Sequence, residues 1–115
     1  MDALRKVPTV NWEAMEWRPV RRGIERKAFT GDGATVALHR ISPGHEVLPH
    51  SHHFEQLVYI IDGEVDFTVG DEVVRLTAGG LLAVPPGVEH CVTLVGEKPA
   101  LNLDIFTPAR PDYVA

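Results

Sequence analysis

The sequence predicts an all-β domain, an antiparallel sandwich or barrel built from short strands. Ten glycines and nine prolines punctuate the chain, and short runs rich in β-branched residues lie between them, a pattern typical of strands. The pairs Asp62-Gly63 and Gly70-Asp71 each separate two such runs and tolerate the positive φ angles of a tight hairpin turn. After Arg26, no long stretch keeps apolar residues at helical spacing, which excludes a helical class.

Each run has a pattern that predicts which of its faces is buried. The segment LVYII, residues 57–61, is apolar on both faces, so we expect a strand buried between two layers. In residues 64–69 the alternation directs Val65, Phe67 and Val69 inward. The seven predicted strands are residues 34–41, 56–61, 65–69, 72–76, 81–84, 91–95 and 100–106.

Size and charge restrict the class of protein. The chain has 115 residues, of which 44% are hydrophobic and 23% charged, as in one globular domain. Its formal net charge of -5 argues against nucleic-acid or membrane partners, because both repel an acidic surface. The basic cluster at residues 18–27 is interrupted by Pro19, Gly23 and Glu25, and we interpret it as a solvated face. A single cysteine, Cys91, cannot form an internal disulfide, so we expect a cytoplasmic protein.

Histidines gather at two places in the chain. In PHSHHFEQ, His50 and His52 are two positions apart, so in an extended chain their imidazoles point to the same face. Gln56 has the same parity, His53 has the opposite one, and His90 follows a rigid Pro-Pro-Gly turn. Three imidazoles and one amide oxygen suit a divalent ion such as zinc, nickel, iron, manganese or cobalt. The sequence therefore predicts one metal ion held by His50, His52, Gln56 and His90.

Both segments resemble the two motifs of the cupin superfamily. GHEVLPHSHHFEQLVYIIDG has Gly44, His50, His52 and Gly63 at the spacings of the first motif. GGLLAVPPGVEH has the glycines, the proline and the final histidine of the second motif. The resemblance implies a cupin β-barrel, also called a double-stranded β-helix or jelly roll, in one domain. Residues 1–30 would form an N-terminal arm that can add edge strands, and residues 31–115 the barrel.

The same resemblance also implies the metal ligands and the oligomeric state. In cupins the two histidines, an acidic residue and the last histidine bind the metal. Here the acidic position is Gln56, and Leu94 replaces the terminal asparagine of the second motif. The glutamine keeps an oxygen donor but argues against the iron-dioxygenase chemistry of members with glutamate. Cupins of this size are usually homodimers, so we expect a homodimer.

The final strand carries the candidate catalytic residues. In ALNLDIFTPARPDY, the alternation places Leu101, Leu103 and Ile105 on one face, which suits the core. The opposite face would point to water or to a cavity. The segment D-x-F-x-P-x-R resembles the end of small cupins of pectin and alginate breakdown, which ring-open 4,5-unsaturated monouronates to linear keto-uronates. The resemblance implies a small carboxylated sugar as substrate and three catalytic residues: Asp104 as proton shuttle, Phe106 as apolar wall and Arg110 as carboxylate partner.

Other functions stay open at the level of sequence. A cupin polyketide cyclase or oxygenase would be favoured by a hydrophobic pocket and by His39 at the metal. A metal- or ligand-binding cupin without catalytic activity is the third reading, since one fold hosts many functions. We expect His39, in the strand TVALHRI, to be a structural histidine bonded to a backbone partner. We interpret Cys91 as a core residue and Tyr59 as a packing residue.

Overall fold

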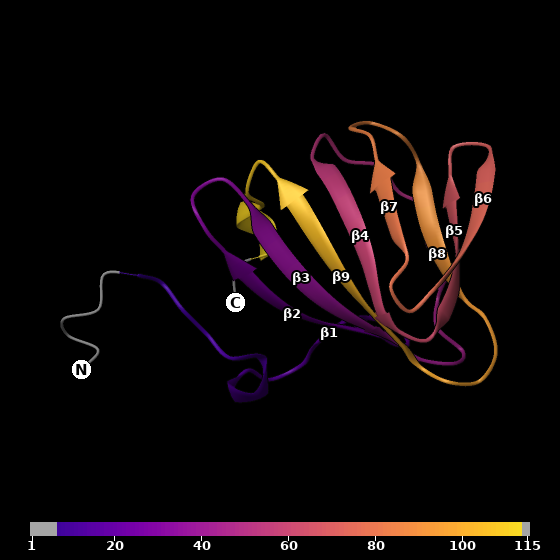
Figure 1. Ribbon diagram of the computed structural model, residues 1–115, viewed down its shortest axis with the longest axis horizontal. Helices are drawn as coiled ribbons and strands as arrows, with labels where there is room; N and C mark the ends of the chain where they lie inside the picture. Colours follow the sequence, from indigo (N-terminus) through magenta and orange to yellow (C-terminus); the bar gives the residue numbers. More distant parts are fainter. Residues whose placement is uncertain (1–6, 114–115) are drawn as a thin grey trace.

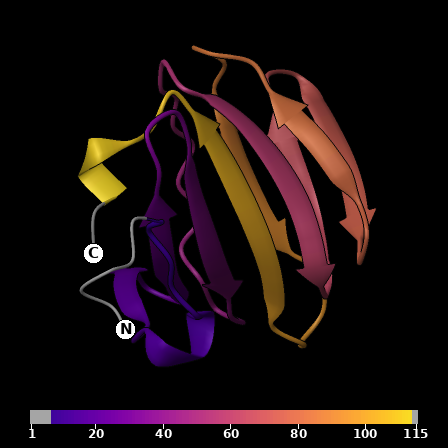
Figure 2. The same cartoon turned by 60° about the vertical axis from the view of Figure 1, so that its left-hand side comes forward.

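The computed structural model describes residues 7–113, and its strands form two facing antiparallel sheets (Figure 1). The large sheet has the order β1-β2-β3-β9-β4-β7, and the small sheet has the order β6-β5-β8. The molecule is a single all-β domain of the jelly-roll type, and Figure 2 shows it turned by 60°. The strands are β1 (Arg18–Arg21), β2 (Ile24–Thr30), β3 (Thr35–Ile41), β4 (Glu55–Asp62), β5 (Glu64–Val69), β6 (Glu72–Thr77), β7 (Leu81–Val84), β8 (His90–Leu94) and β9 (Ala100–Thr107), with 3₁₀ turns η2 (Trp12–Ala14) and η3 (Pro111–Tyr113).

All seven predicted strands are present, with boundaries that differ by one residue at most. Residues 18–30, which the sequence analysis placed in the arm, form β1 and β2 of the large sheet, and β2 pairs with β3 along its whole length. The hairpin predicted at Gly70 joins the paired strands β5 and β6. Residues 7–113 include no helix long and apolar enough to cross a membrane.

The hairpin predicted at Asp62-Gly63 is wrong. Strand β4 pairs with β7 and β9, whereas β5 pairs with β6 and β8, so the chain passes here from one sheet to the other. Gly63 has a φ of +92°, and an added Cβ would lie 2.7 Å from Ala100. The glycine is therefore required by the backbone conformation and by the close approach of β9, and not by a hairpin.

Strand β4 is buried on one face only, contrary to the prediction. Val58 and Ile60 are fully buried between the sheets, but Leu57, Tyr59 and Ile61 are each about 40% exposed on the outer face of the large sheet. Both faces of β4 are apolar, but only one of them belongs to the core, and the other is exposed to solvent. The small sheet behaves as expected, since Val65 and Phe67 point inward and are buried.

The polar face of β9 lines the cavity, one of the two positions left open for it, whereas the apolar face is not the core face that its pattern suggested. Asn102, Asp104 and Phe106 are buried and face the interior, whereas the leucines and isoleucine between them are only half-buried on the outside. Part of the space between the sheets is therefore polar. The apolar core, which includes Ile24, Ile41 and Ile60, fills the rest.

Truncation of this core is expected to destabilise the fold. Ile60 is completely buried, so Ile60→Ala should lower the free energy of unfolding by about 2–5 kcal/mol, because it removes apolar contacts and leaves a cavity. Denaturant titration followed by circular dichroism measures the loss. Val73→Ala is the control, since Val73 is 64% exposed on β6, and it should change stability by less than about 0.5 kcal/mol. Equal losses in the two variants would contradict this description of the core.

Candidate metal centre and pocket

Two segments bring three histidines together. His90 begins β8, and its backbone pairs with that of His50 through hydrogen bonds of 2.9 and 3.0 Å. His52 lies two residues further along the same loop. The nearest ring nitrogens of the three side chains all lie within 4.8 Å of one another, which is close enough for one ion to contact all three.

Hydrogen bonds orient each of the three imidazoles. In every ring Nδ1 lies within hydrogen-bond distance of a backbone carbonyl and donates its proton there, which leaves the lone pair of Nε2 free. A partner of this kind is typical of metal-binding histidines. The three bonds are His50 to Leu48 (2.8 Å), His52 to Phe54 (2.9 Å) and His90 to Val88 (2.9 Å).

Gln56 completes the set that the sequence predicted. Its amide nitrogen donates to Asp104 Oδ1 over 2.9 Å, so its Oε1 points the other way and lies 3.1 Å from His52 Nε2. Both of these facing atoms are acceptors when His52 is neutral. His90 Nε2 is buried and has no hydrogen-bond partner. Facing acceptors and an unpartnered buried nitrogen are what a bound cation would satisfy, so the four residues fit a divalent metal.

The surroundings of two of these histidines favour the neutral ligand form. Desolvation lowers the pKa of both His50 and His90 below the usual value for histidine, and the neighbouring imidazoles lower it further. Neutral imidazole binds a metal, whereas imidazolium cannot. The pKa shifts therefore favour the protonation state that the centre requires.

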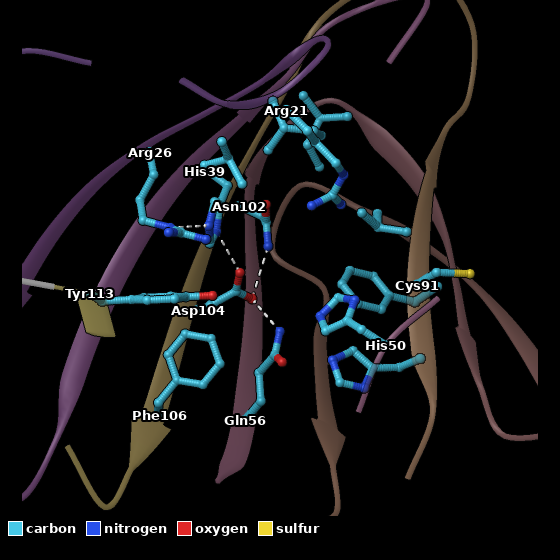
Figure 3. A pocket seen from close by; sticks show the side chains of 16 residues that line it. Arg21, Arg26, His39, His50, Gln56, Cys91, Asn102, Asp104, Phe106 and Tyr113 are labelled. Carbon is cyan, nitrogen blue, oxygen red and sulfur yellow. Dashed lines mark hydrogen bonds and ion pairs between the residues drawn. The ribbon is translucent and has the colours of Figure 1, made fainter. Parts of the chain in front are cut away.

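A cavity of about 60 Å³ lies beside the histidines, between the two sheets (Figure 3). Its walls combine apolar side chains with a few polar ones that converge on one place, as small-molecule sites do. The apolar part includes Ile24, Ile41 and Phe67. The polar part consists of Arg21, Arg26, His39, His50, Gln56, His90, Asn102, Asp104 and Tyr113.

Asp104 is the centre of the polar wall. Its Oδ1 accepts from the amides of Gln56 and Asn102, both at 2.9 Å, and its Oδ2 accepts from His39 Nδ1 at 2.7 Å. The carboxylate therefore determines which way the Gln56 amide faces. Phe106 lies on the same strand and packs edge-on against His52, with 5.5 Å between ring centroids. Both candidate residues of β9 line the cavity, as the resemblance implied.

His39 differs from the structural histidine expected from the sequence. Its side-chain partners are Asp104 and Arg26, whose Nε donates to His39 Nε2 over 2.9 Å, and neither partner is a backbone group. His39 lines the cavity but is not part of the three-histidine cluster. It is therefore a polar residue of the pocket and does not fill the role of a fifth metal ligand.

Arg110 is in a different place from the other candidate catalytic residues. Its side chain is buried but is not part of the cavity wall. The guanidinium pairs with Asp112 at 2.7 and 3.2 Å, and its carbon lies 3.9 Å from the ring centroid of Tyr113. Two phenylalanine rings, Phe54 and Phe106, pack against it at 4.7 Å. Arg110 thus supports the turn that brings Tyr113 to the pocket.

Three polar residues of the pocket wall were not assigned to a site from the sequence, namely Arg21, Arg26 and Tyr113. The basic segment is only partly solvated, because Arg26 alternates with the buried residues Ile24 and Ala28 along β2 and so faces inward. That parity was a usable signal. Cys91 is only half-buried, contrary to the core position expected for it, and its sulfur points away from the pocket in Figure 3.

A small two-sheet jelly roll with a cluster of three histidines that could hold a metal ion is the arrangement typical of cupin domains. The family model described as "Cupin domain" matches residues 37–106. The chain belongs to the cupin family.

Two solved cupin structures have the same fold. The RmlC-like cupin from Shewanella frigidimarina NCIMB 400 has a TM-score of 0.83 and 27% sequence identity, over 91% of this chain and 94% of the other. KdgF from Halomonas sp. has a TM-score of 0.86 and 23% identity, over 95% of this chain and 100% of the other. Because KdgF is only 23% identical to this chain, its similarity shows the fold alone.

Two curated relatives have different activities. Acireductone dioxygenase of Yarrowia lipolytica is 38% identical over 71 residues, which are 57% of this chain and 40% of that protein. H2HPP isomerase of Bacillus subtilis is 27% identical over 92 residues, which are 79% of this chain and 38% of that protein. The chain spans about two fifths of the length of these relatives.

Proposed function

We propose that this protein is a metal-dependent cupin enzyme that converts 4,5-unsaturated monouronates into linear keto-uronates. The observation that carries the proposal is the position of Asp104 and Phe106 in one cavity with His50 and His90 of the three-histidine cluster. Both residues belong to the D-x-F-x-P-x-R segment that resembles the uronate-opening cupins. The Halomonas KdgF match supports a protein of this size and architecture, since it covers both chains almost completely.

The reaction is an isomerisation in which one proton moves. The hydroxyl at C1 loses its proton, the bond between C1 and the ring oxygen breaks, and C1 becomes an aldehyde. The ring oxygen stays on C5 as an enol, and addition of a proton at C4 with loss of the enol proton gives the 5-keto product. No oxidant or further reactant is consumed, so a positioned acid/base group and an electrophile meet the chemical requirements.

The residues of the pocket have separate roles in this proposal. Asp104 takes the proton from the sugar hydroxyl and returns it, while Phe106 forms the apolar wall against one face of the ring. A divalent ion held by the three histidines and Gln56 would supply Lewis-acid polarisation of a substrate oxygen. Arg110 acts from behind the wall, through its contacts with Phe106 and Tyr113.

The test is an absorbance assay on the unsaturated substrate. Ring opening removes the conjugated C4–C5 double bond, so metal-loaded protein should abolish the ultraviolet absorbance of a 4,5-unsaturated monouronate, and a chelator should stop the reaction. Product identity is checked by NMR, which should show an aldehyde hydrate and a 5-keto carbon. If the folded, metal-loaded protein lowers the absorbance no faster than buffer alone does, the proposed function is refuted.

A cyclase, an oxygenase and a binding protein are the competing functions. The features that would favour a cyclase are a mostly hydrophobic pocket and His39 at the metal, whereas the wall is rich in polar groups and His39 bonds to Asp104. A pure binding module has no need of a buried carboxylate facing its ligand. An inactive protein in the uronate assay that consumes oxygen with another substrate would move the assignment to an oxygenase.

We also propose a cytoplasmic homodimer. The outer face of the large sheet exposes Leu57, Tyr59 and Ile61 on β4, and Leu81 on the edge strand β7 lies directly opposite Tyr59. Contiguous exposed apolar surface usually marks an interface. A patch without opposed charges can pair with a copy of itself across a twofold axis, so a second copy of this chain is the occupant we infer. The lone thiol of Cys91 is compatible with a reducing compartment.

A charge placed in this patch should separate the subunits. Tyr59→Lys would bury an unpaired ammonium in the interface, so the molecular mass measured by light scattering should fall from that of a dimer to that of a monomer. Val73→Lys, on the small sheet, is the control and should remain dimeric. A wild-type protein that is monomeric at the concentrations used would contradict the proposed dimer.

A further inference from the structure

Arg26 is an inward-pointing cation in the middle of β2. Along this strand Ile24, Arg26 and Ala28 share the face that points between the sheets. Arg26 is the direct cross-strand neighbour of His39, and His39 is the neighbour of Asn102, so the three side chains form a row across β2, β3 and β9. Figure 3 shows this row on the side of the cavity opposite His50.

Two contacts hold the guanidinium in place. Its Nε donates to His39 Nε2 over 2.9 Å, and its carbon lies 3.6 Å from the ring centroid of Tyr113. His39 donates from its other nitrogen to Asp104, so the imidazole is neutral and accepts from Arg26 without neutralising its charge. The planar group is thus fixed on one edge and one face, and its terminal N–H groups are left for a ligand.

Arg26 forms no ion pair with a carboxylate in the part of the chain that the structure describes, although Asp104 and Asp112 lie near enough to act on its charge. Three other arginines, Arg40, Arg75 and Arg110, each form an ion pair with an aspartate or glutamate. Burial lowers the pKa of Arg26, which indicates that its environment disfavours the charge. A half-buried cation is costly unless an anion compensates it, and residues with this kind of imbalance cluster at functional sites.

Among residues 7–113, the cavity wall contains two arginines, Arg21 and Arg26, but only one carboxylate, that of Asp104. Its arginine charges therefore outnumber its carboxylate charges. The Nε of Arg21 donates to the backbone oxygen of Glu46, so Arg21 also lacks a carboxylate partner there. With a divalent ion at the histidines, the pocket would be strongly positive. Its charge therefore favours an anionic ligand.

We propose that Arg26 binds the carboxylate of the ligand, so that a small monocarboxylate lies along the wall from Arg26 past Asp104 toward the three histidines. This inference rests on the proposed function where it names a uronate. It gives Arg26 the role that the sequence resemblance assigned to Arg110, which does not line the cavity and whose Nε and Nη2 pair with Asp112. The carboxylate end of the sugar and the end that reaches the metal are then different, and Asp104 lies between them.

The experiment compares a carboxylate with its neutral ester. Metal-loaded protein is titrated by calorimetry with galacturonate and with its methyl ester, which differ only in the charged group. Wild-type protein should prefer galacturonate. Arg26→Gln should weaken galacturonate binding about 10- to 100-fold, because a hydrogen-bonded charge pair is lost, and should leave the ester nearly unchanged. Arg26→Lys keeps the charge without the planar fork and should give an intermediate loss.

The matched control is Arg40→Gln. Arg40 follows His39 on β3, faces the opposite side of the sheet and pairs with Glu25, so the same change of charge should leave both affinities as in wild type. Melting temperatures show which variants are folded; if Arg26→Gln is not, Arg26→Lys decides. Equal affinity of wild type for acid and ester would overturn the inference, as would a preference that survives Arg26→Gln or is lost only in Arg21→Gln.

The same variants separate this inference from the proposed function. If Arg26 governs galacturonate binding but the wild type leaves the unsaturated uronate intact, the proposed reaction fails and the carboxylate site stands. If ring opening proceeds and Arg26→Gln keeps the wild-type KM, the reaction stands and the carboxylate site fails.

Discussion

Asp104→Asn is expected to reduce kcat on the unsaturated uronate by about 100- to 10,000-fold, the range for loss of a positioned general acid/base group. The amide can neither take nor return the proton. In wild type, Gln56, Asn102 and His39 all donate hydrogen bonds to the carboxylate. The NH₂ group of the asparagine would face either the two amide donors or His39, and two donors cannot bond to each other. Steady-state kinetics on metal-loaded protein measures the loss.

Metal content decides how the Asp104 result is interpreted, because Asp104 also orients the Gln56 amide. The expected outcome is a metal occupancy close to wild type with a large fall in kcat. Asp66→Asn is the matched control, since Asp66 pairs with Arg75 on the small sheet, away from the cavity, and it should keep full turnover. An Asp104→Asn variant that keeps wild-type kcat, or one that loses activity only in proportion to lost metal, would contradict the proton-transfer role.

His90→Ala is expected to abolish stoichiometric metal binding. His90 is almost completely buried, and its unpartnered Nε2 faces the other two imidazoles. Its removal takes away one of four ligands, so affinity for Zn²⁺ or Ni²⁺ should fall by more than about 100-fold, beyond what the loss of a supporting residue costs. Elemental analysis after dialysis measures the occupancy, and turnover should fall with it.

His53→Ala is the matched control for His90→Ala. His53 is a neighbour of His52 in the chain, but its ring stacks on Phe54 with 4.2 Å between centroids and is not part of the three-histidine cluster. The variant should retain the metal and the activity. If His90→Ala binds metal as tightly as His53→Ala does, the assignment of the ligands is wrong.

The gathering of the three histidines could be predicted from the sequence because its geometry is local. His50 and His52 have the parity and spacing of an extended segment, and the Pro-Pro-Gly turn fixes the approach of His90. The strands were equally readable, since Gly and Pro interrupt the chain at nearly every boundary. The structure adds the carbonyl partners of the three imidazoles and the bond between Gln56 and Asp104, which depend on loops and on register.

The faces of β4 and β9 could not be assigned from their own patterns. Both strands carry apolar residues on the outside of the sheet, as Tyr59 and Leu103 do, and these two residues are paired across the ladder. Alternation identifies two faces but does not say which of them is buried when the exposed face is apolar. The polar interior of β9 reflects the cavity, which requires buried groups with partners in place of an apolar core.

The positions of Arg26 and Arg110 could likewise not be predicted from the pattern of charges in the sequence. Arg26 and Arg110 lie 84 positions apart in the chain, and Tyr113 lies between their guanidinium groups, at 3.6 and 3.9 Å. A sequence pattern cannot show which of two cations reaches a pocket, because that depends on how the C-terminal turn folds back over β2. Local charge patterning therefore predicted a solvated cluster where the structure has a pocket residue.

Metal loading of the wild-type protein is the decisive test of whether this cupin holds a divalent ion through His50, His52, Gln56 and His90. The protein is stripped with a chelator, dialysed against Zn²⁺, Ni²⁺, Fe²⁺, Mn²⁺ or Co²⁺ in turn, and analysed for bound metal after removal of the free ion. We expect one ion per chain for at least one of these metals. Folded protein that retains none of them would contradict this expectation.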